Sequence, residues 1–238
     1  MVTKLKAIYR VLRAIMNLWL IRFNAYIRKK RGIPQQTSVD RKIFKSVFQR
    51  YVGKRLRVFE WGMGRSTIYY SRYLRSIGSD FEWYSIDNSH EWMQNVDQLV
   101  HRYKLTTRVH LRLSEFPAFW ELPSWSWEQT KIPREDLCGP KVVEYVEYPR
   151  QVMMPKGFDV IIIDGRYRRR CLLTAFEVLA PGGVVILHDA ERIHYHSSLE
   201  NYISSRFFNS GKLPRSEIET KTWVGTLDRD PFIEGLTV

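Results

Sequence analysis

The strongest structural signal in the chain is the run Arg57-Val-Phe-Glu-Trp-Gly-Met-Gly-Arg-Ser-Thr-Ile-Tyr-Tyr-Ser71. A short apolar segment leads into the acid Glu60, two glycines form a turn, and Ser66 and Thr67 open an apolar helix. A strand, a glycine turn and a helix in this order are typical of nucleotide-binding crevices, where free amides at the helix start face an anionic group. The run therefore predicts an α/β fold with a ligand at this turn.

The details of the turn separate it from other phosphate-binding motifs. A dinucleotide motif has a third glycine and a phosphate-binding loop has a lysine before the serine, and both are missing here. The pattern Glu60-x-Gly62-x-Gly64-x-Ser66-Thr67 resembles the first motif of class I S-adenosylmethionine-dependent methyltransferases, in the branch E-[YW]-G-x-G-x-S-T that includes sugar and glycan O-methyltransferases. The resemblance implies that these five residues bind the cofactor, with Glu60 and the turn at its methionine end. The alternative is an incidental turn in which Ser66 only caps the helix.

The remaining apolar segments alternate between expected strands and expected helices. Expected strands cover 56–59, 81–87, 107–113, 158–165, 183–189 and residues near 222–226. Expected helices begin at Ser38 and cover 66–76, 90–100, 167–179 and 197–207, with Pro181-Gly182-Gly183 ending the fourth of these helices. This alternation indicates a Rossmann-like doubly wound, mostly parallel sheet with helices on both faces.

Asp87 ends the second expected strand, about 20 residues past the glycine turn, where a ribose-binding carboxylate belongs. A carboxylate there accepts hydrogen bonds from both ribose hydroxyls. Because Asp-Asn-Ser is also favourable turn chemistry, a turn role is the alternative. Trp92, in the helix that follows, either covers the adenine or belongs to the core.

Two polar runs begin at the carboxyl ends of the two most apolar strands. They are Asp164-Gly-Arg166 and His188-Asp189-Ala-Glu-Arg192. The same methyltransferase branch shows Asp-Gly-Arg after its fourth strand and His-Asp with a nearby arginine after its fifth, so the resemblance covers roughly residues 40–225, apart from the segment 114–156. Ligands of open α/β sheets bind outside these strand ends. We therefore expect Asp164, His188 and Asp189 on the acceptor side of the site.

Two routes for removing a proton from an acceptor hydroxyl fit these residues. In the first, His188 or Asp189 acts as general base. In the second, Asp164 and Asp189 hold a divalent cation such as Mg²⁺, which lowers the pKa of the hydroxyl. A histidine that only forms a hydrogen bond at its strand end is the structural alternative. Arg166 and Arg192 are the expected substrate-binding residues, because arginine matches the carboxylates and phosphates of an acidic or lipid-linked sugar or of RNA.

The amino-acid composition, above all the net charge, indicates which kinds of molecule the protein binds. The 238 residues carry 38 Lys and Arg against 25 Asp and Glu, a net charge of +13, which favours nucleic acid, an anionic membrane surface or acidic substrates. The two cysteines, Cys138 and Cys171, form no metal-binding spacing and no disulfide framework, so a reducing, cytoplasmic setting is expected.

Residues 4–31 form an expected amphipathic helix with one basic face, inside a segment 1–36 that precedes the methyltransferase domain 37–238. Its longest apolar stretch is too short to span a bilayer, and no secretory cleavage site follows. It predicts either peripheral contact with an anionic membrane on the cytoplasmic face or a helix docked on protein. Residues 114–156 are expected to be an irregular insertion that forms part of the acceptor pocket or simply packs.

The leading hypothesis is an S-adenosylmethionine-dependent methyltransferase that methylates a sugar or glycan hydroxyl. An RNA methyltransferase is the enzyme alternative, although no N-P-P-Y-like motif follows the fourth strand and no RNA-binding module is recognisable. A non-catalytic membrane or nucleic-acid binding protein with the same fold is the third class, and the cofactor motif argues against it.

Overall fold

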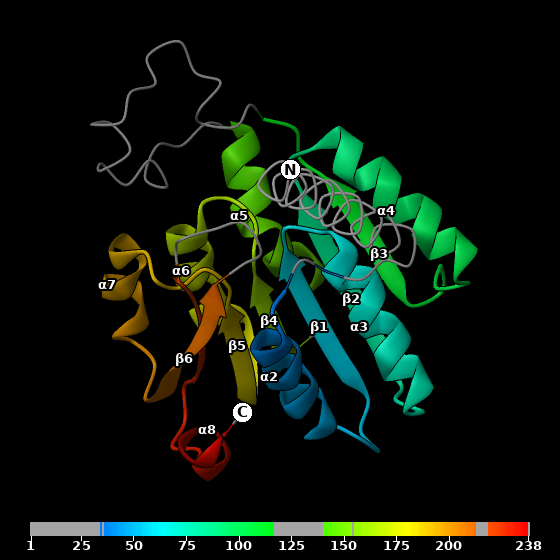
Figure 1. Cartoon of the computed structure of the whole chain (residues 1–238). Coiled ribbons are helices and arrows are strands. Elements are labelled where there is room, and N and C mark those ends of the chain that lie inside the picture. Colours follow the sequence, from blue (N-terminus) through cyan, green and yellow to red (C-terminus); the bar gives the residue numbers. More distant parts are fainter. Residues whose placement is uncertain (1–33, 35, 117–139, 154, 213–218, 238) are drawn as a thin grey trace, which may run out of the picture.

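The computed structural model describes residues 34, 36–116, 140–153, 155–212 and 219–237, and these form one seven-stranded sheet in the order β3-β2-β1-β4-β5-β7-β6 (Figure 1). The strands are β1 Leu56–Trp61, β2 Phe81–Asp87, β3 Val109–Leu113, β4 Phe158–Ile163, β5 Leu179–Leu187, β6 Ser204–Lys212 and β7 Glu219–Thr226. Neighbours from β3 to β5 are parallel, whereas β7 is antiparallel to both β5 and β6. The expected Rossmann-like, mostly parallel sheet is confirmed.

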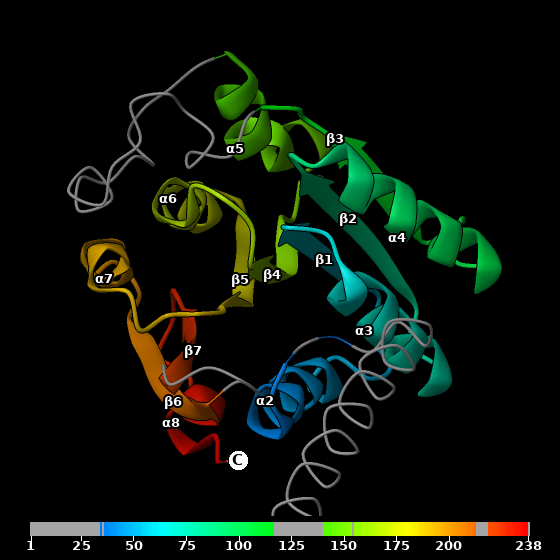
Figure 2. The same cartoon turned by 45° about the horizontal axis from the view of Figure 1, so that its top comes forward.

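Helices cover both faces of this sheet (Figure 2). They are α2 Ser38–Gln49, α3 Arg65–Ser76, α4 His90–Arg102, α5 Pro140–Val152, α6 Arg168–Val178, α7 His196–Leu199 and α8 Pro231–Gly235. Buried side chains of α2, α3 and α4 pack into one apolar core and those of α5, α6 and α7 into a second core on the other face. The sheet is thus the middle layer of three.

Strand β4 shows why the central strands read as continuous apolar runs. Val160 and Ile162 belong to the core under α2 to α4, while Ile161 and Ile163 belong to the core under α5 to α7. Alternate side chains of a strand point to opposite faces, so a strand covered on both faces has no polar positions. Each such buried side chain contributes about 1.5–3 kcal/mol.

The four parallel strands β2, β1, β4 and β5 all have their carboxyl ends on the same side of the sheet. Strand order runs outward from β1 to β2 and β3 and then returns to β4 and β5, so the order reverses between β1 and β4. Backbone bonds continue the pairing past the strand ends, from Gly62 N–H to Ile86 O at 2.9 Å, from Asp164 N–H to Trp61 O at 2.9 Å and from His188 N–H to Ile163 O at 3.1 Å. A crevice at this reversal is where doubly wound sheets bind ligands.

Two expectations about the second half of the chain were wrong. The helix expected over 197–207 ends at Leu199, and residues 204–212 instead form β6, which pairs along the whole of β7. Pairing of β6 with β7 and burial of Phe208 override the local helical pattern. The expected helix stop at residues 181–183 lies inside β5, which begins directly after α6 at Leu179.

The segment 114–156 is only partly as expected. Residues 140–152 form α5 and are not irregular, and Tyr145 of this helix is fully buried. The prolines at positions 140 and 149 argued against a helix in the sequence, although proline is well tolerated at the first helical position. Residues 117–139, and the helix expected over 4–31, lie outside the described residues.

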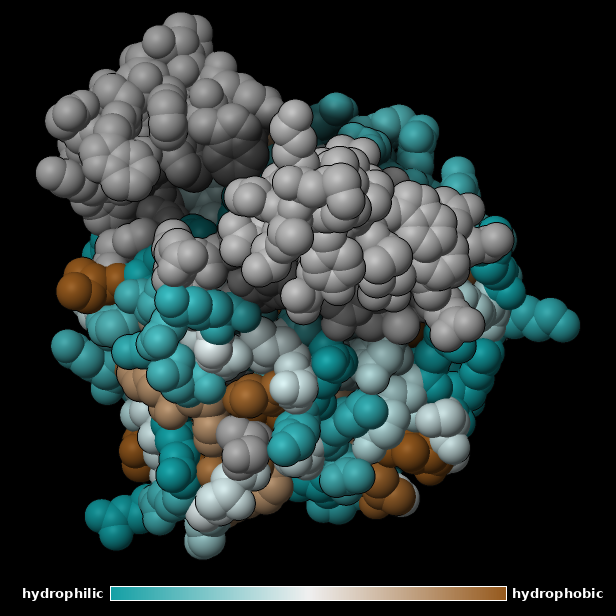
Figure 3. Space-filling view, viewed as in Figure 1, coloured by the Kyte–Doolittle hydropathy of each residue, from teal (hydrophilic) through white to brown (hydrophobic). Residues whose placement is uncertain are grey.

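Among the described residues visible in Figure 3, polar side chains cover most of the surface, and hydrophobic residues appear as separate patches. Among the described residues, no helix combines the length and hydropathy needed to cross a membrane.

Candidate active site

A cavity of about 870 Å³ opens at the carboxyl ends of the parallel strands. Eight of the residues expected at the site from the sequence line it: Gly62, Gly64, Ser66, Asp87, Asp164, Arg166, His188 and Asp189. Glu60, Thr67 and Arg192 do not line it. The structure therefore brings both polar strand-end runs and the glycine turn into one hollow.

The two glycines of the turn have different reasons to be glycine. Gly62 has φ +94°, and a Cβ on it would lie 2.4 Å from the backbone nitrogen of Gly165 in the loop after β4. Gly64 has an extended backbone, and a Cβ there would meet only Ser66 Oγ at 3.9 Å. Gly62 thus allows two loops to touch, whereas Gly64 leaves open space beside the cavity for a ligand to approach.

Glu60 is fully buried below the turn. Its carboxylate accepts hydrogen bonds from Ser66 Oγ at 2.7 Å, Thr67 Oγ1 at 2.5 Å, Trp83 Nε1 at 3.0 Å and Ser85 Oγ at 3.0 Å. Burial raises the pKa of Glu60 to about 7, although these four hydrogen bonds act in the opposite direction.

Thr67 also accepts a hydrogen bond from the backbone N–H of Gly64 at 2.9 Å. A chain of hydrogen bonds therefore runs from the turn through Thr67 to Glu60. In this structure Glu60 and Thr67 fix the shape of the turn and the start of α3, and the cofactor contact expected of these two residues stays a prediction.

Asp87, at the end of β2, lines the cavity and is 7% exposed. Its Oδ1 accepts a hydrogen bond from the backbone N–H of Ser89 at 2.8 Å. Burial raises the pKa of Asp87 to about 6, against the hydrogen bond from Ser89 and the charge of Arg166. Trp92 lines the same cavity and is 47% exposed, so it is a wall residue and not part of the core.

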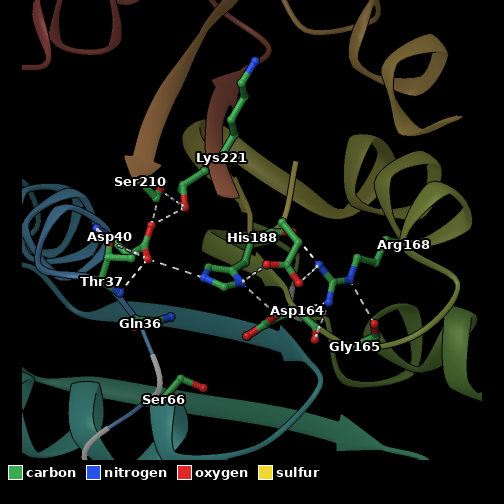
Figure 4. A network of polar contacts seen from close by, with 12 residues as sticks. Gln36, Thr37, Asp40, Ser66, Asp164, Gly165, Arg168, His188, Ser210 and Lys221 are labelled. Carbon is green, nitrogen blue, oxygen red and sulfur yellow. Dashed lines mark hydrogen bonds and ion pairs between the residues drawn. The ribbon is translucent and has the colours of Figure 1, made fainter. Parts of the chain in front are cut away.

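Asp164, His188 and Asp189 form one cluster at the ends of β4 and β5 (Figure 4). His188 Nδ1 lies 3.2 Å from Asp164 Oδ1 and 3.2 Å from Asp189 Oδ1. Burial lowers the pKa of His188, but Asp164 and the neighbouring carboxylates outweigh burial and raise it well above its usual value. Asp189 has φ +52°, an unusual backbone conformation of the kind that concentrates at functional sites.

Arg168 supports this cluster from α6, and its role was not predicted from the sequence. The side chain is buried and donates to the backbone oxygens of Gly165, Asp164 and His188, with Oδ1 of Asp164 at 3.2 Å and Oδ2 of Asp189 at 3.4 Å (Figure 4). It therefore ties the loop after β4 to the loop after β5. The sequence shows only one arginine in a run of three, residues 168–170, so nothing local distinguishes it from a solvated helix face.

Asp40, in the first turn of α2, is a second site residue that was not predicted. Its side chain is 0% exposed, and its Oδ2 lies 3.6 Å from His188 Nε2. His188 thus contacts carboxylates with both ring nitrogens, Asp40 on one edge and Asp164 with Asp189 on the other (Figure 4). This contact forms because the fold brings the start of α2 beside the end of β5, and the sequence alone does not indicate it.

The two expected substrate-binding arginines differ in position. Arg166 lines the cavity and is partly buried, and its backbone N–H donates to the hydroxyl of Tyr145 at 3.1 Å. Arg192 is 49% exposed, lies outside the lining, and approaches Asp189 Oδ2 at 3.9 Å. Arg166 is therefore the better placed of the two to contact a ligand in the cavity.

The donor set fits a nucleoside-type cofactor and also a metal ion. The cavity volume lies within the range of cofactor sites, Asp87 offers a carboxylate at its wall, and the backbone of Gly64 is open to close approach. Asp164, His188 and Asp189 each place one potential ligand atom within 4.8 Å of the others, a spacing that a divalent cation could bridge.

Comparisons with known proteins identify the domain family and agree with the fold. A family model described as a methyltransferase domain matches residues 59–190. An O-methyltransferase from Bacillus cereus in complex with SAH superposes with a TM-score of 0.54 at 14% identity, covering 84% of this chain and 86% of that one. Precorrin 8W decarboxylase from Methanobacterium thermoautotrophicum gives a TM-score of 0.49 at 16% identity, covering 80% of this chain and 90% of that one. No curated protein sequence matches the chain.

Proposed function

The chain belongs to the methyltransferase-domain family, and we propose that it transfers a methyl group from S-adenosylmethionine to a hydroxyl of a sugar or glycan. One observation carries the proposal. A single cavity is lined both by Asp87 and the glycine turn and by the cluster of Asp164, His188 and Asp189. The first set suits a nucleoside with an amino-acid tail, and the second suits an acceptor that must lose a proton.

Bound S-adenosylmethionine would supply an electrophilic methyl group. The chain's part is to bind and orient both reactants. Asp87 would accept hydrogen bonds from the ribose hydroxyls, while Gly64 and Ser66 would contact the methionine end. Holding an acceptor oxygen in line with the methyl group can lower the activation barrier by about 7–11 kcal/mol.

The exposed fractions of the cluster indicate which group meets the acceptor. The side chain of Asp164 is 27% exposed and that of Asp189 is 20%, whereas His188 is 8% exposed. An acceptor hydroxyl entering the cavity would meet a carboxylate oxygen first, and His188 stands behind it. We propose that Asp164 accepts the hydroxyl proton and that the charge of His188, whose Nδ1 lies 3.2 Å from a carboxylate oxygen of each, holds Asp164 and Asp189 in place.

The same three side chains favour a metal-dependent alternative, because their ligand atoms have the spacing of a cation site. Asp164 and Asp189 would then be the ligands, and the cation would lower the pKa of the acceptor hydroxyl. Metal analysis of the purified protein and turnover after treatment with EDTA distinguish the two routes.

Arg166 gives the acceptor a charge preference. A guanidinium on the cavity wall is suited to a carboxylate or phosphate, which favours an acidic or lipid-linked sugar. The basic, amphipathic sequence of residues 4–31 would bring the enzyme to an anionic membrane, where lipid-linked acceptors lie. Both partners are proposals from charge and sequence pattern.

Radiolabelled methyl transfer to a panel of acceptors tests the function. The panel contains a neutral glycoside, a uronic-acid glycoside, a sugar linked to lipid pyrophosphate, and RNA. We expect labelling of a sugar acceptor, with the acidic or pyrophosphate-linked one preferred. Labelling of RNA alone would replace the sugar proposal by the nucleic-acid alternative, and binding of cofactor without any transfer would contradict the enzyme proposal for these acceptors.

A further inference from the structure

Asp40 lies outside the region that the methyltransferase family model matches, yet it reaches the acceptor cluster. The match begins at residue 59, and α2 precedes it. Apolar side chains on the inner face of α2 pack into the core, namely Ile43, Phe44, Val47 and Phe48. This packing brings the first turn of α2 beside the carboxyl end of β5.

The hydrogen bonds of Asp40 fix its carboxylate from three elements. Its Oδ2 accepts from the backbone N–H and the hydroxyl of Thr37, each at 2.8 Å, which completes a capping box at the start of α2. Its Oδ1 accepts from Thr222 Oγ1 of β7 at 2.7 Å and from the hydroxyl of Ser210 of β6 (Figure 4). The carboxylate therefore cannot swing toward or away from the cavity.

A capping box alone does not explain a fully buried carboxylate. Burying a charge is costly unless an opposite charge accompanies it. The hydroxyls of Thr37, Ser210 and Thr222 are neutral, and among the described residues the cationic partner within ion-pair distance of Asp40 is His188, at 3.6 Å. The pair therefore accounts for the placement of both groups in the interior.

The His188 ring needs a partner on each edge to have one orientation. The terminal torsion of histidine is broad, so packing alone sets the ring plane poorly. Asp164 and Asp189 engage Nδ1, and Asp40 is the group opposite Nε2. Loss of Asp40 would remove the carboxylate that faces the buried Nε2 at 3.6 Å, an ion-pair contact longer than a hydrogen bond, and would free the ring to rotate away from the two rim carboxylates.

We propose that Asp40 is a positioning residue of the acceptor site, which holds the His188 ring in the orientation that presents Nδ1 to Asp164 and Asp189. The inference rests on the proposed function for the assignment of that cluster to the acceptor, but the orientation itself can be tested without any acceptor. Through this contact, the segment before the family-matched region becomes part of the catalytic machinery.

The test compares Asp40→Asn with Asp230→Asn. Asp230 is a matched control, because it is also a buried aspartate that caps a helix and pairs with a cation, Arg50, but it lies outside the cavity lining. Crystal structures of both variants report the ring orientation. Calorimetry reports cofactor affinity, and turnover on the acceptor found by labelling reports kcat and KM.

We expect Asp40→Asn to show a rotated or multiply oriented His188 ring, unchanged cofactor affinity, and kcat lower by about 10- to 100-fold with little change in KM, because small misplacements in a site have effects of this size. Asp230→Asn should lower the melting temperature without moving the ring or kcat. A ring that stays in place in Asp40→Asn, or an equal loss of kcat in both variants, would overturn the proposal. If wild-type protein methylates no acceptor, the proposed function fails, while the ring orientation still decides the role of Asp40.

Discussion

Gly62 and Gly165 bring two loops into direct backbone contact. A Cβ on Gly62 would lie 2.4 Å from the nitrogen and 2.5 Å from the Cα of Gly165, and a Cβ on Gly165 would lie 2.0 Å from the hydroxyl of Tyr145. The loop after β1 and the loop after β4 therefore pack without intervening side chains. This contact fixes the distance between the glycine turn and Asp164 across the floor of the cavity.

Substituting the two glycines of the turn should separate packing from ligand binding. Gly62→Ala meets both an unfavourable φ and a backbone clash, so the free energy of unfolding should fall by about 2–6 kcal/mol. Gly64→Ala adds a methyl group to open space, so stability should change by less than about 1 kcal/mol while cofactor affinity falls. Urea unfolding and calorimetry measure the two effects. Equal stability losses in both variants would contradict this division of roles.

Glu60 should make the stability of the cofactor-free protein depend on pH. Its pKa is raised by burial to about 7 in the folded state, above the value in the unfolded chain, so the folded state binds more protons between these values. Stability from this group is therefore present at low pH and is lost as the pH rises from about 5 to about 7. Urea unfolding across this range should show the fall in wild type and a smaller fall in Glu60→Gln.

The exposed Glu200 provides the control for Glu60. Glu200→Gln should keep the wild-type pH dependence. If Glu60→Gln also keeps it, Glu60 is ionised throughout this range and the burial argument is wrong.

The sequence predicted the parts of the site that lie next to strand ends. Asp87, Asp164, His188 and Asp189 follow apolar strands directly, and the carboxyl ends of parallel strands converge, so their meeting follows from local pattern and topology. Asp40 could not be found this way, because it reads as an ordinary acid in the first turn of a helix. Its partner His188 lies 148 residues later in the chain (188 − 40), and only tertiary packing brings the two side chains together.

Glu60 illustrates a different gap between pattern and structure. The motif identified an acid at the right place in the chain, but the side-chain alternation of β1 turns it away from the cavity and toward four donors. The helix expected over 197–207 failed for a related reason. Pairing between β6 and β7 is a non-local interaction, and local periodicity does not report it.

Asp87 should make cofactor binding depend on pH. Its pKa of about 6 means that acid protonates the carboxylate that is proposed to accept hydrogen bonds from the ribose hydroxyls. Affinity for S-adenosylhomocysteine should therefore be about tenfold weaker at about pH 5 than at about pH 7. Asp87→Asn should bind more weakly at both pH values and show no such dependence. Calorimetry that finds the same pH dependence in the variant would remove Asp87 from the ribose site.

The basic N-terminal sequence should act independently of the cofactor site. Each basic side chain near an anionic surface can contribute about 1 kcal/mol, and this contribution is screened by salt. The full chain should sediment with phosphatidylserine-containing vesicles at low salt and less at high salt. A variant lacking residues 1–33 should stay in solution and still bind cofactor, because no residue of the expected cofactor motif precedes Glu60. A full chain that ignores these vesicles at low salt would leave docking on protein as the role of residues 4–31.

Asp164 is the group proposed to meet the acceptor, and a comparison of cofactor binding with turnover in Asp164→Asn tests this role most directly. Asp164 and Asp87 line the same cavity but are assigned to different reactants. The variant should bind S-adenosylmethionine within about threefold of wild type and lose turnover by about 100-fold or more, the size expected for loss of a proton acceptor. Wild-type turnover in Asp164→Asn, or equal losses of cofactor affinity and turnover, would contradict the account.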